Sequence, residues 1–352
     1  MPFLTDMLLA NKMRRTVCCI GVMANILGFS VAGMNTAHAL DLNQHTRLQN
    51  AVAPLITEGL YTSAELQAIF DDVQLRQAVV KKKANAAEKK LTWRGNANRP
   101  GGYRGIFLQP ERVQQGVEFW QQYADELERA SLVYGVEPEV ICAIIGVETK
   151  FGRIKGKDKV IESISTLADR GSKLQTRQLP EFLRLVKQGH LQLDVVGSYA
   201  GAMGIPQFIS TSYSAYGVDF TGDGRVDLIN DPIDAIGSVA NYFKQHGWKM
   251  GAPVVYPITP TTSKINDVAS RKRRTLSTVG AIQQLANGIP RHLSAETPAT
   301  VVKLLGPNDV PEYFISLKNF YVITKYNHSV FYAMAVHDLS REIKQRYMAQ
   351  NR

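Results

Sequence analysis

The sequence predicts a mainly helical protein of the α+β class, with a small helical unit before a helical core and a small β-rich insertion after it. Apolar residues recur at helical intervals from Gln109 onward. Residues 140–147 are apolar on every side, so they predict a central, buried helix. β-branched runs gather between Pro253 and about Ile323, which predicts strands there.

The first 39 residues have the pattern of a secretory signal. Three basic residues precede an uncharged run over 16–34, and residues 37–39 supply the small-x-small pattern that signal peptidase accepts. We therefore interpret residues 1–39 as a cleaved signal peptide and expect a periplasmic protein. The uncharged run is also about long enough to span a bilayer when tilted, so a membrane-anchored form stays open.

Composition and charge narrow the class of protein. Hydrophobic residues make up 45% and charged residues 20%, as in an ordinary globular protein. Without residues 1–39 the formal charge falls from +10 to +8, so the exported chain stays basic and suits a polyanionic matrix. Export makes nucleic acid an unsuitable target. Cys142 is then the one remaining cysteine, which excludes an intrachain disulfide and favours a buried core residue.

The region 40–100 predicts the small helical unit and a linker. Thr62 and Ser63 precede Ala64-Glu65-Leu66 as a helix cap would, and a Lys-rich, Ala-rich stretch follows over 81–90. Residues 96–105 are rich in Gly, Asn, Arg and Pro, which is typical of a loop.

The helical core is predicted over 101–252. Pro138 occupies a position that proline favours in the first turn of a helix. Further helices are expected over 180–187 and 232–246, the second capped by Asn230-Asp231. The β-rich insertion is assigned to 253–323. The segment 324–352 is predicted to return to the core through a helix over 329–345.

Glu148 is the candidate catalytic carboxylate. It ends the apolar run, and Gly152 can stop the helix just after it. Apolar neighbours would strip water from the carboxyl group and raise its pKa, which a general acid needs near neutral pH. The alternative is a glutamate at a helix end that reaches water or pairs with Lys150 or Arg153. On this feature alone the two interpretations stay open.

A second segment, 197–208, is dense in glycine and alanine. Such a segment lets the backbone approach a ligand closely. Ser198, Tyr199 and Gln207 offer hydrogen bonds there, and Met203 offers an apolar contact.

Three segments taken together resemble the lytic murein transglycosylase B family: Glu148-Thr149-Lys150-Phe151-Gly152, Gly197-Ser198-Tyr199-Ala200-Gly201-Ala202-Met203-Gly204, and Asp234-Ala235-Ile236-Gly237-Ser238-Val239-Ala240-Asn241-Tyr242-Phe243. The resemblance extends from about Tyr103 to Leu339. It implies a lysozyme-like helical core and an enzyme that cleaves peptidoglycan strands between N-acetylmuramic acid and N-acetylglucosamine.

The resemblance also implies chemistry with a single acid. Glycosidases ordinarily use two carboxylates that flank the scissile bond. In the resembled family the acid that matches Glu148 protonates the leaving oxygen and then acts as a base, while the 6-hydroxyl of muramic acid closes on its own anomeric carbon. The product carries a 1,6-anhydro end. Asp194 lies close enough to the glycine-rich segment to stay open as a second acid.

The family's substrate contacts match eight positions of this chain: Tyr103, Ser198, Met203, Gln207, Tyr242, Tyr326, Asn327 and Tyr332. Tyrosine rings suit such a site because they stack on the apolar faces of sugars. Core packing is the alternative for each tyrosine. The family's basic pair for the wall peptide falls near 169–173, where the chain is shortened, and is left unassigned.

Residues 219–227 resemble an EF-hand loop. Asp219, Thr221 and Asp223 stand at positions 1, 3 and 5, Gly224 stands at the sharp turn, and Arg225 would contribute its backbone carbonyl. Position 12 is not the usual glutamate, and the resemblance implies a longer loop closed by Asp234. We expect a structural Ca²⁺ ion and no organic cofactor. An Asp/Gly turn without an ion is the alternative.

The predicted function is therefore that of a peptidoglycan lytic transglycosylase acting in cell-wall turnover, with glycan strands as its partner. The rival interpretations are a hydrolytic muramidase and a non-catalytic peptidoglycan-binding or scaffold protein. Association with the membrane and with wall-synthesis complexes is left open by the sequence.

Overall fold

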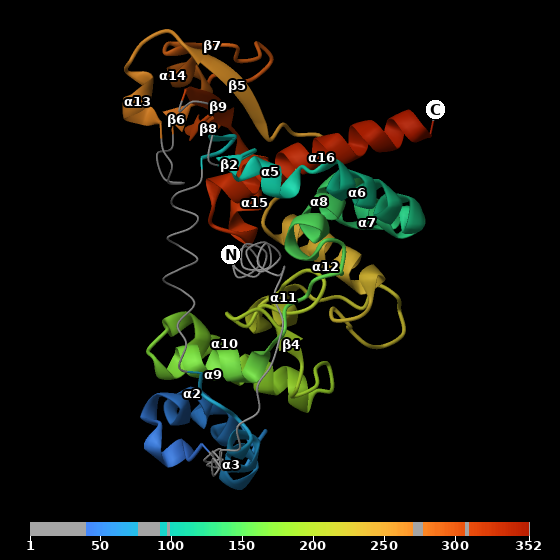
Figure 1. Cartoon of the computed structure of the whole chain (residues 1–352), viewed down its shortest axis with the longest axis vertical. Helices are drawn as coiled ribbons and strands as arrows, with labels where there is room; N and C mark the ends of the chain where they lie inside the picture. Colours follow the sequence, from blue (N-terminus) through green and yellow to red (C-terminus); the bar gives the residue numbers. More distant parts are fainter. Residues whose placement is uncertain (1–39, 77–91, 97–98, 270–276, 307–309, 352) are drawn as a thin grey trace, which may run out of the picture. The chain divides into compact units, whose positions relative to one another are not determined.

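The computed structural model describes residues 40–76, 92–96, 99–269, 277–306 and 310–351 (Figure 1). The predicted signal peptide, 1–39, and the Lys-rich stretch, 81–90, lie outside these residues. Contacts divide the chain into two compact units. Among the described residues, unit 1 comprises 40–76, 156–203 and 208–214, and unit 2 comprises 92–96, 99–155, 204–207, 215–269, 277–306 and 310–351.

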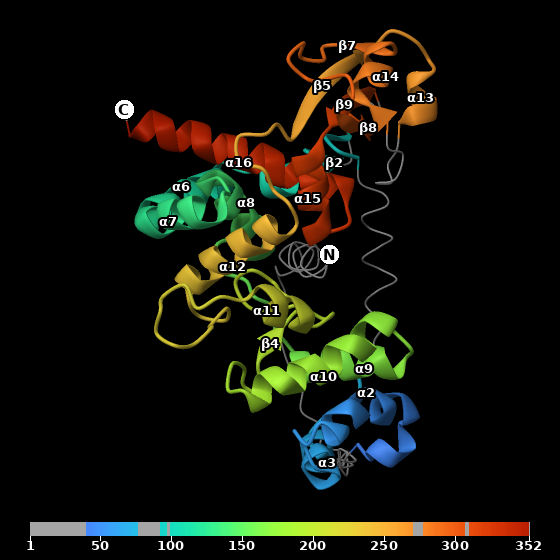
Figure 2. The same ribbon diagram turned by 180° about the vertical axis from the view of Figure 1, so that it is seen from behind.

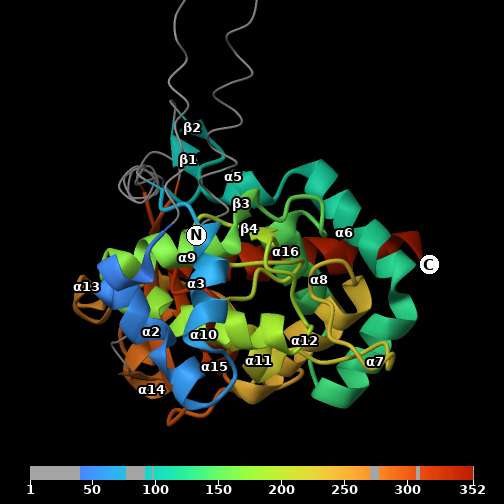
Figure 3. The same ribbon diagram turned by 90° about the horizontal axis from the view of Figure 1, so that it is seen from below.

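Unit 1 is built from helices that are far apart in the sequence. Its principal helices are α2 (Thr46–Thr57), α3 (Ser63–Asp71), α9 (Val160–Asp169) and α10 (Lys173–Lys187). α2 packs against both α9 and α10 (Figure 3). This packing divides the predicted core, 101–252, so the observed units differ from the predicted boundaries. Residues 156–203 bury their apolar side chains against the N-terminal helices, which no local pattern in the sequence reveals.

Two local features of unit 1 bear on the predictions. Thr62 caps α3 in a reciprocal capping box with Glu65, as the sequence predicted. α10 begins seven residues before the predicted start, Pro180, and accommodates that proline in its interior. The carbonyl of Thr176 therefore lacks the usual partner four residues on. A short antiparallel pair, β3 (Asp158–Lys159) and β4 (Val196–Gly197), leads into the glycine-rich segment.

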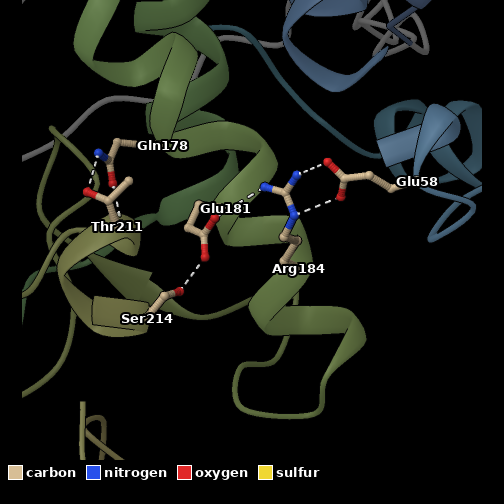
Figure 4. Close-up of polar contacts among 6 residues, drawn as sticks. All are labelled: Glu58, Gln178, Glu181, Arg184, Thr211 and Ser214. Atoms are coloured by element: carbon tan, nitrogen blue, oxygen red, sulfur yellow. Dashed lines mark hydrogen bonds and ion pairs between the residues drawn. The ribbon is translucent and has the colours of Figure 1, made fainter. Parts of the chain in front are cut away.

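Polar side chains of α10 form hydrogen bonds with the start of α11 (Ser210–Tyr216), the helix that follows the glycine-rich segment 197–208 (Figure 4). Gln178 is buried; its amide donates to Thr211 Oγ1 at 2.9 Å, and its Oε1 accepts from the Thr211 N–H at 2.9 Å. Arg184 donates from Nε to Glu58 at 3.1 Å and from Nη1 to Glu181 at 3.2 Å. α10 is thus hydrogen-bonded both to the start of α11 and to Glu58, which directly follows α2.

Unit 2 contains the helical core and a small sheet. Its helices are α5 (Arg104–Phe107), α6 (Pro110–Gln122), α7 (Ala124–Tyr134), α8 (Pro138–Thr149), α12 (Pro232–Gln245), α15 (Lys318–Tyr326) and α16 (Val330–Gln350). α8 is central: α6, α7, α12 and α16 all pack against it (Figure 2). Pro138 opens α8, and every residue from Glu139 to Thr149 is buried, as predicted for the apolar run.

Among the described residues no single helix is long and apolar enough to cross a membrane. α7 and α8 pass that test only when taken together, and they meet at an angle of 112°.

The predicted β-rich insertion forms an antiparallel sheet in the order β6-β8-β9-β5-β7. Its strands are β5 (Val255–Pro260), β6 (Ser277–Thr278), β7 (Ala286–Asn287), β8 (Pro298–Leu305) and β9 (Pro311–Ser316). Two short helices, α13 (Ile265–Val268) and α14 (Val279–Gln283), cover a core that includes Val301 and Ile315. A separate hairpin, β1 (Gly95–Asn96) and β2 (Arg99–Pro100), precedes α5.

The predicted end of this insertion is wrong. The sequence predicts strands up to about Ile323, yet Lys318–Tyr326 form the helix α15. Val322, Ile323 and Thr324 are buried, and α15 packs on α16, so tertiary packing overrides the strand preference. The C-terminal segment therefore holds two helices, α15 and α16, instead of one.

Candidate active site

The end of α8 positions Glu148. Lys150 and Phe151 both have positive φ, 52° and 59°, which turns the chain sharply after Thr149. The Phe151 ring folds back over Gly146, where an added Cβ would lie 2.6 Å from Phe151 Cζ. Glycine at 146 is therefore required for this close approach, and the approach fixes the last turn of the helix, which carries Glu148.

Glu148 is a buried carboxyl group with a phenol as its hydrogen-bond partner. Its residue is 9% exposed, and Tyr332 donates a hydrogen bond of 2.6 Å to Oε1. Burial raises the pKa of Glu148 above its ordinary value, although the hydrogen bond from Tyr332 opposes the shift. The carboxyl group therefore stays protonated to a higher pH than a solvated glutamate, which a general acid needs near neutral pH.

Three of the predicted tyrosines form a series of ring contacts that begins at Tyr332, the partner of this carboxyl group. The Tyr326 ring stacks with Tyr332 at 6.4 Å between centroids, and Tyr242 meets Tyr326 edge-on at 4.8 Å. Burial and the charge of Glu148 raise the pKa values of Tyr326 and Tyr332 well above the ordinary value. Both hydroxyls therefore stay protonated, and each acts as a donor.

The segment 204–207 is tied to the end of α8. Thr149 Oγ1 donates to the carbonyl of Ile205 at 2.8 Å and accepts from the Gly152 N–H at 2.9 Å. Tyr326 donates from its hydroxyl to the carbonyl of Pro206 at 2.5 Å. The segment therefore contacts both the helix that carries Glu148 and a tyrosine that packs beside Tyr332.

Gln207 has two unusual features. Its φ is 52°, a left-handed conformation that residues other than glycine rarely adopt. Its amide nitrogen donates to the carbonyls of Lys155 and Gly204, at 3.1 and 3.0 Å. Its Oε1 is buried and accepts no hydrogen bond within the described part of the chain. A strained residue with an unsatisfied acceptor is a candidate ligand-binding group.

Two predicted contacts belong to unit 1. Ser198 is buried, and its Oγ accepts from the Ala202 N–H at 3.0 Å. Met203 is also buried, and its backbone forms an isolated antiparallel β-bridge with Phe208. Their contact with the substrate stays a prediction. Asp194, the open second acid, is exposed in the turn before β4.

Tyr103 and Asn327 complete the predicted set. Tyr103 is fully buried in an aromatic cluster with Trp93, Phe107 and Phe331, with ring centroids 5.2–6.3 Å apart. This position fits the packing alternative. Asn327 ends α15 in an extended conformation and is partly exposed.

A buried arginine lies beside the site. Arg112 on α6 is 2% exposed, and its Nη1 donates at 2.6 Å to the carbonyl of Gly146 in the last turn of α8. Burial lowers the pKa of Arg112 to about 10, so the guanidinium stays charged near neutral pH. A cation at the C-terminal end of a helix stabilises its last turn. Arg112 carries no sequence signal, because the contact depends on how α6 packs against α8.

The predicted calcium loop folds as a turn that Asp219 organises. Its carboxylate accepts from the N–H groups of Gly222 and Gly224, at 2.6 and 2.7 Å. Gly224 has φ of 89°, as expected of the glycine at the sharp turn. Arg129 holds the loop from α7, because its guanidinium lies 3.7 Å over the Phe220 ring and donates to the Phe220 carbonyl at 2.6 Å.

The Asp234 carboxylate accepts hydrogen bonds from backbone N–H groups of the loop. Asp234 is 1% exposed. Its Oδ1 accepts from the N–H groups of Phe220 and Thr221 at 2.8 and 3.0 Å, and its Oδ2 accepts from the N–H group of Asp227 at 2.7 Å. Among the described residues no three His, Cys, Asp or Glu side chains gather closely enough to hold a metal ion. The oxygen donors suit a hard cation such as Ca²⁺, and Thr221 Oγ1 lies 3.1 Å from Asp219 Oδ1 and 3.3 Å from Asp234 Oδ1.

Comparisons with known proteins agree on one family. A family model described as the transglycosylase SLT domain matches residues 44–341. The chain is 37% identical over 317 residues to the membrane-bound lytic murein transglycosylase B of Escherichia coli strain K12, which covers 86% of this chain and 84% of that protein.

Solved structures give the same result. The catenated lytic transglycosylase SltB1 from Pseudomonas aeruginosa matches with a TM-score of 0.79 and 36% identity, over 87% of this chain and 100% of that one. Lytic transglycosylase Slt35 from Escherichia coli, in complex with calcium, matches with a TM-score of 0.74 and 33% identity, over 89% and 97%. SltB3 from Pseudomonas aeruginosa, in complex with NAG-NAM-pentapeptide, matches with a TM-score of 0.70 and 29% identity, over 85% and 79%.

Proposed function

The chain belongs to the family of lytic murein transglycosylases, enzymes that cleave peptidoglycan, and we propose that a single carboxylic acid, Glu148, performs the cleavage. The observation that carries this proposal is the buried Glu148 carboxyl group, hydrogen-bonded to Tyr332 at 2.6 Å and shifted to a raised pKa.

The reaction begins with protonated Glu148 as a general acid. Its proton passes to the glycosidic oxygen as the bond from that oxygen to C1 of muramic acid breaks, and the bonding electron pair leaves with the oxygen. Glu148 is then a carboxylate. It accepts the proton of the 6-hydroxyl of the same muramic acid as O6 bonds to C1. The product carries a 1,6-anhydro end, no water is consumed, and Glu148 is protonated again.

Tyr332 supports both states of Glu148. Its phenol stays protonated and donates to Oε1, which stabilises the carboxylate that forms midway through the reaction. The hydrogen bond also fixes the side-chain orientation. Tyr332 is thus a positioning residue for Glu148 as well as a predicted substrate contact.

The remaining predicted contacts form the proposed sugar-binding set. Tyr242 and Tyr326 supply aromatic faces, Gln207 supplies the unsatisfied Oε1, and Asn327 supplies an amide. Ser198 and Met203 are included because they belong to the glycine-rich segment that resembles the family. Tyr103 is included for the same resemblance, although it packs in an aromatic cluster.

A structural calcium ion is a second part of the proposal. Asp219, Thr221 and Asp223 would bind it through side-chain oxygens and Arg225 through its carbonyl, with Asp234 closing the loop. The oxygen-only donors and the turn at Gly224 support this role, and the calcium complex of Slt35 supports it by analogy. The ion would stabilise the segment before α12 and take no part in the chemistry.

We place the protein in the cell envelope. The relative named membrane-bound lytic murein transglycosylase B supports this location. The leader pattern over 1–39 supports export to the periplasm, with either a cleaved signal or a retained anchor. Peptidoglycan strands are the partner on which the proposed activity depends.

Mass spectrometry of digested peptidoglycan tests the proposed function. The wild type is expected to release products with 1,6-anhydro ends, and Glu148→Gln is expected to release none. Reducing ends from the wild type would instead identify a hydrolytic muramidase. Binding without any release would identify a non-catalytic wall-binding protein, and anhydro products from Glu148→Gln would remove Glu148 from its role.

A further inference from the structure

The chain turns sharply after α8 through two consecutive residues that are not glycine. Lys150 and Phe151 both lie in the left-handed region, with φ of 52° and 59°. This conformation is costly for residues that carry a side chain, and it persists only where surrounding contacts enforce it. Glu148 lies two residues before the turn. The contacts that enforce the turn therefore also fix the end of the helix that carries Glu148.

One face of α6 supplies two of these contacts. Arg112 and Gly116 are four residues apart, so they lie on the same face of the helix. Gly116 leaves room for the Phe151 ring, because an added Cβ would lie 3.1 Å from Phe151 Cζ. Arg112 Nη1 donates at 2.6 Å to the carbonyl of Gly146. α6 therefore contacts both the aromatic ring of the turn and the helical backbone just before it.

The carbonyl of Gly146 has a second donor. The N–H of Lys150 also donates to it, at 3.2 Å. The carbonyl would thus keep a hydrogen-bond partner without Arg112. Arg112 is 2% exposed, and burying a guanidinium is costly because a charged group loses its water. Its hydrogen bond therefore adds a constraint on the last turn of α8 beyond what the carbonyl itself requires.

The last turn of α8 reaches the catalytic hydrogen bond directly. Glu148 Oε1 accepts from the hydroxyl of Tyr332 at 2.6 Å, and Tyr332 lies on α16, which packs against both α6 and α8. All of these elements belong to unit 2. A short hydrogen bond weakens steeply when its angle changes. A small rotation of the last turn would therefore move Glu148 out of line with Tyr332.

We propose that Arg112 is a positioning residue for Glu148. Its hydrogen bond to Gly146 holds the last turn of α8 in the orientation in which Glu148 meets Tyr332 and the glycosidic oxygen. This inference rests on the proposed function, because it assumes that Glu148 is the general acid. Arg112 acts through the backbone of α8 and not on the substrate, so its loss lowers kcat and leaves KM in place.

Steady-state kinetics of anhydro-product release from peptidoglycan test the proposal in the full-length protein. Methionine is apolar and has no hydrogen-bond donor, so kcat of Arg112→Met should fall roughly tenfold at an unchanged KM. The assay runs well below the melting midpoint of each variant, where a loss of stability alone leaves kcat unchanged. Arg112→Lys keeps a cationic donor and should retain most of the wild-type kcat.

A double-mutant cycle with Tyr332→Phe supplies a measurement that a purely structural role would not change. If Arg112 aligns Glu148 with Tyr332, its effect depends on the Tyr332 hydroxyl. Arg112→Met should then lower kcat roughly tenfold in the wild type but less than about threefold in the Tyr332→Phe background.

Arg346→Met is the matched control for the loss of an arginine that links two helices. Arg346 Nη1 donates at 3.3 Å to the carbonyl of Pro110, which joins α16 to the start of α6. This contact does not involve the end of α8. Both kcat and KM of Arg346→Met should therefore match those of the wild type.

Four results would overturn the proposal. The first is an unchanged kcat in Arg112→Met, and the second is an equal kcat in Arg112→Lys and Arg112→Met, which would show that the donor is not needed. The third is an equal loss in the wild-type and Tyr332→Phe backgrounds. The fourth is a loss of the same size in Arg346→Met, which would indicate a general effect of helix packing.

Glu148→Gln separates this inference from the proposed function. If Glu148→Gln releases no anhydro products while Arg112→Met matches the wild type, the proposed function stands and the role of Arg112 alone is excluded. Anhydro products from Glu148→Gln would remove both.

Discussion

The hydroxyl of Tyr332 donates a 2.6 Å hydrogen bond to Oε1 of Glu148, across 184 positions of sequence. Burial raises the pKa of Glu148 and this hydrogen bond lowers it; the effect of burial is the larger, so the pKa is raised. The two residues thus set the pH range over which the general acid is protonated.

Tyr332→Phe should move that range upward. Without the donor, the carboxylate loses its stabilising partner, the pKa of Glu148 rises further, and the alkaline limb of kcat/KM against pH shifts to higher pH. We also expect kcat to fall about tenfold, because the carboxyl group is no longer held in one orientation. Tyr326→Phe is the matched control, since its hydroxyl donates to Pro206 and its loss should leave the limb in place. A limb that stays fixed in Tyr332→Phe would contradict this prediction.

Glu148→Gln should stabilise the protein at neutral pH. The folded-state pKa of Glu148 is raised, so the folded protein binds more protons than the unfolded chain above the unfolded value of 4.5. Stability is therefore lost as pH rises through the folded pKa, and glutamine removes that loss. Thermal melting should show a higher midpoint for Glu148→Gln than for the wild type at pH 7, with the gap closing near pH 4.

The control for this comparison is another buried glutamate on the same helix. Glu139 is also 9% exposed, but it pairs with Lys344 at 2.7 Å. Glu139→Gln loses this ion pair, so it should not raise the midpoint at pH 7. A gain of equal size in both variants would show that the effect of Glu148→Gln is not specific to its position.

The sequence predicted the parts of the site that follow from local pattern. Residues 140–147 predict a buried helix, and α8 confirms it, whereas the apolar run alone left open whether Glu148 at its end is buried or reaches water. The glycine at the sharp turn of the loop was predicted for the same reason, because position 224 needs a positive φ. In each case a few neighbouring residues determine the structure.

Features that depend on distant packing could not be predicted. The β-branched residues of α15 favour a strand locally, yet burial against α16 makes them helical. Arg112 reaches Gly146 only because α6 packs on α8. The hydrogen bonds of Asp234 could not be predicted either, since an aspartate in the first turn of a helix can equally serve as a metal ligand or as an acceptor for backbone N–H groups.

His337 should make the protein sensitive to acid. Burial lowers the pKa of His337 to about 4 from its ordinary value of 6.5. The unfolded chain therefore takes up a proton between these values while the folded protein does not, so stability is lost as pH falls from 6.5 towards 4. The loss reaches roughly 3 kcal/mol at most, from 1.36 kcal/mol per unit of pKa.

Urea unfolding between pH 7 and pH 4 checks this value. His337→Gln should remove most of the pH dependence assigned to this group, whereas His292→Gln, at an exposed position, should retain it. Equal slopes of unfolding free energy against pH in all three proteins would exclude His337 as the sensitive group.

Calcium should raise the melting temperature through the 219–227 loop. A bound ion stabilises the folded state by mass action, so the midpoint should rise with calcium concentration and fall back with chelator. Asp223→Ala should abolish the rise, because it removes an oxygen donor from position 5. Asp267→Asn removes one negative charge in α13 and should keep the rise. An equal midpoint with calcium and with chelator in the wild type would remove the metal from the loop.

Asp234→Asn should destabilise the protein even without calcium. The buried Asp234 carboxylate accepts hydrogen bonds on both oxygens, from the N–H groups of Phe220 and Thr221 on one and from Asp227 on the other. An amide nitrogen in place of either oxygen would face an N–H donor, at a cost of about 2–3 kcal/mol. We expect a midpoint lower by roughly 5 °C or more in chelator. Asp231→Asn is the control, because asparagine also caps a helix well. A wild-type midpoint for Asp234→Asn in chelator would make Asp234 a calcium ligand alone.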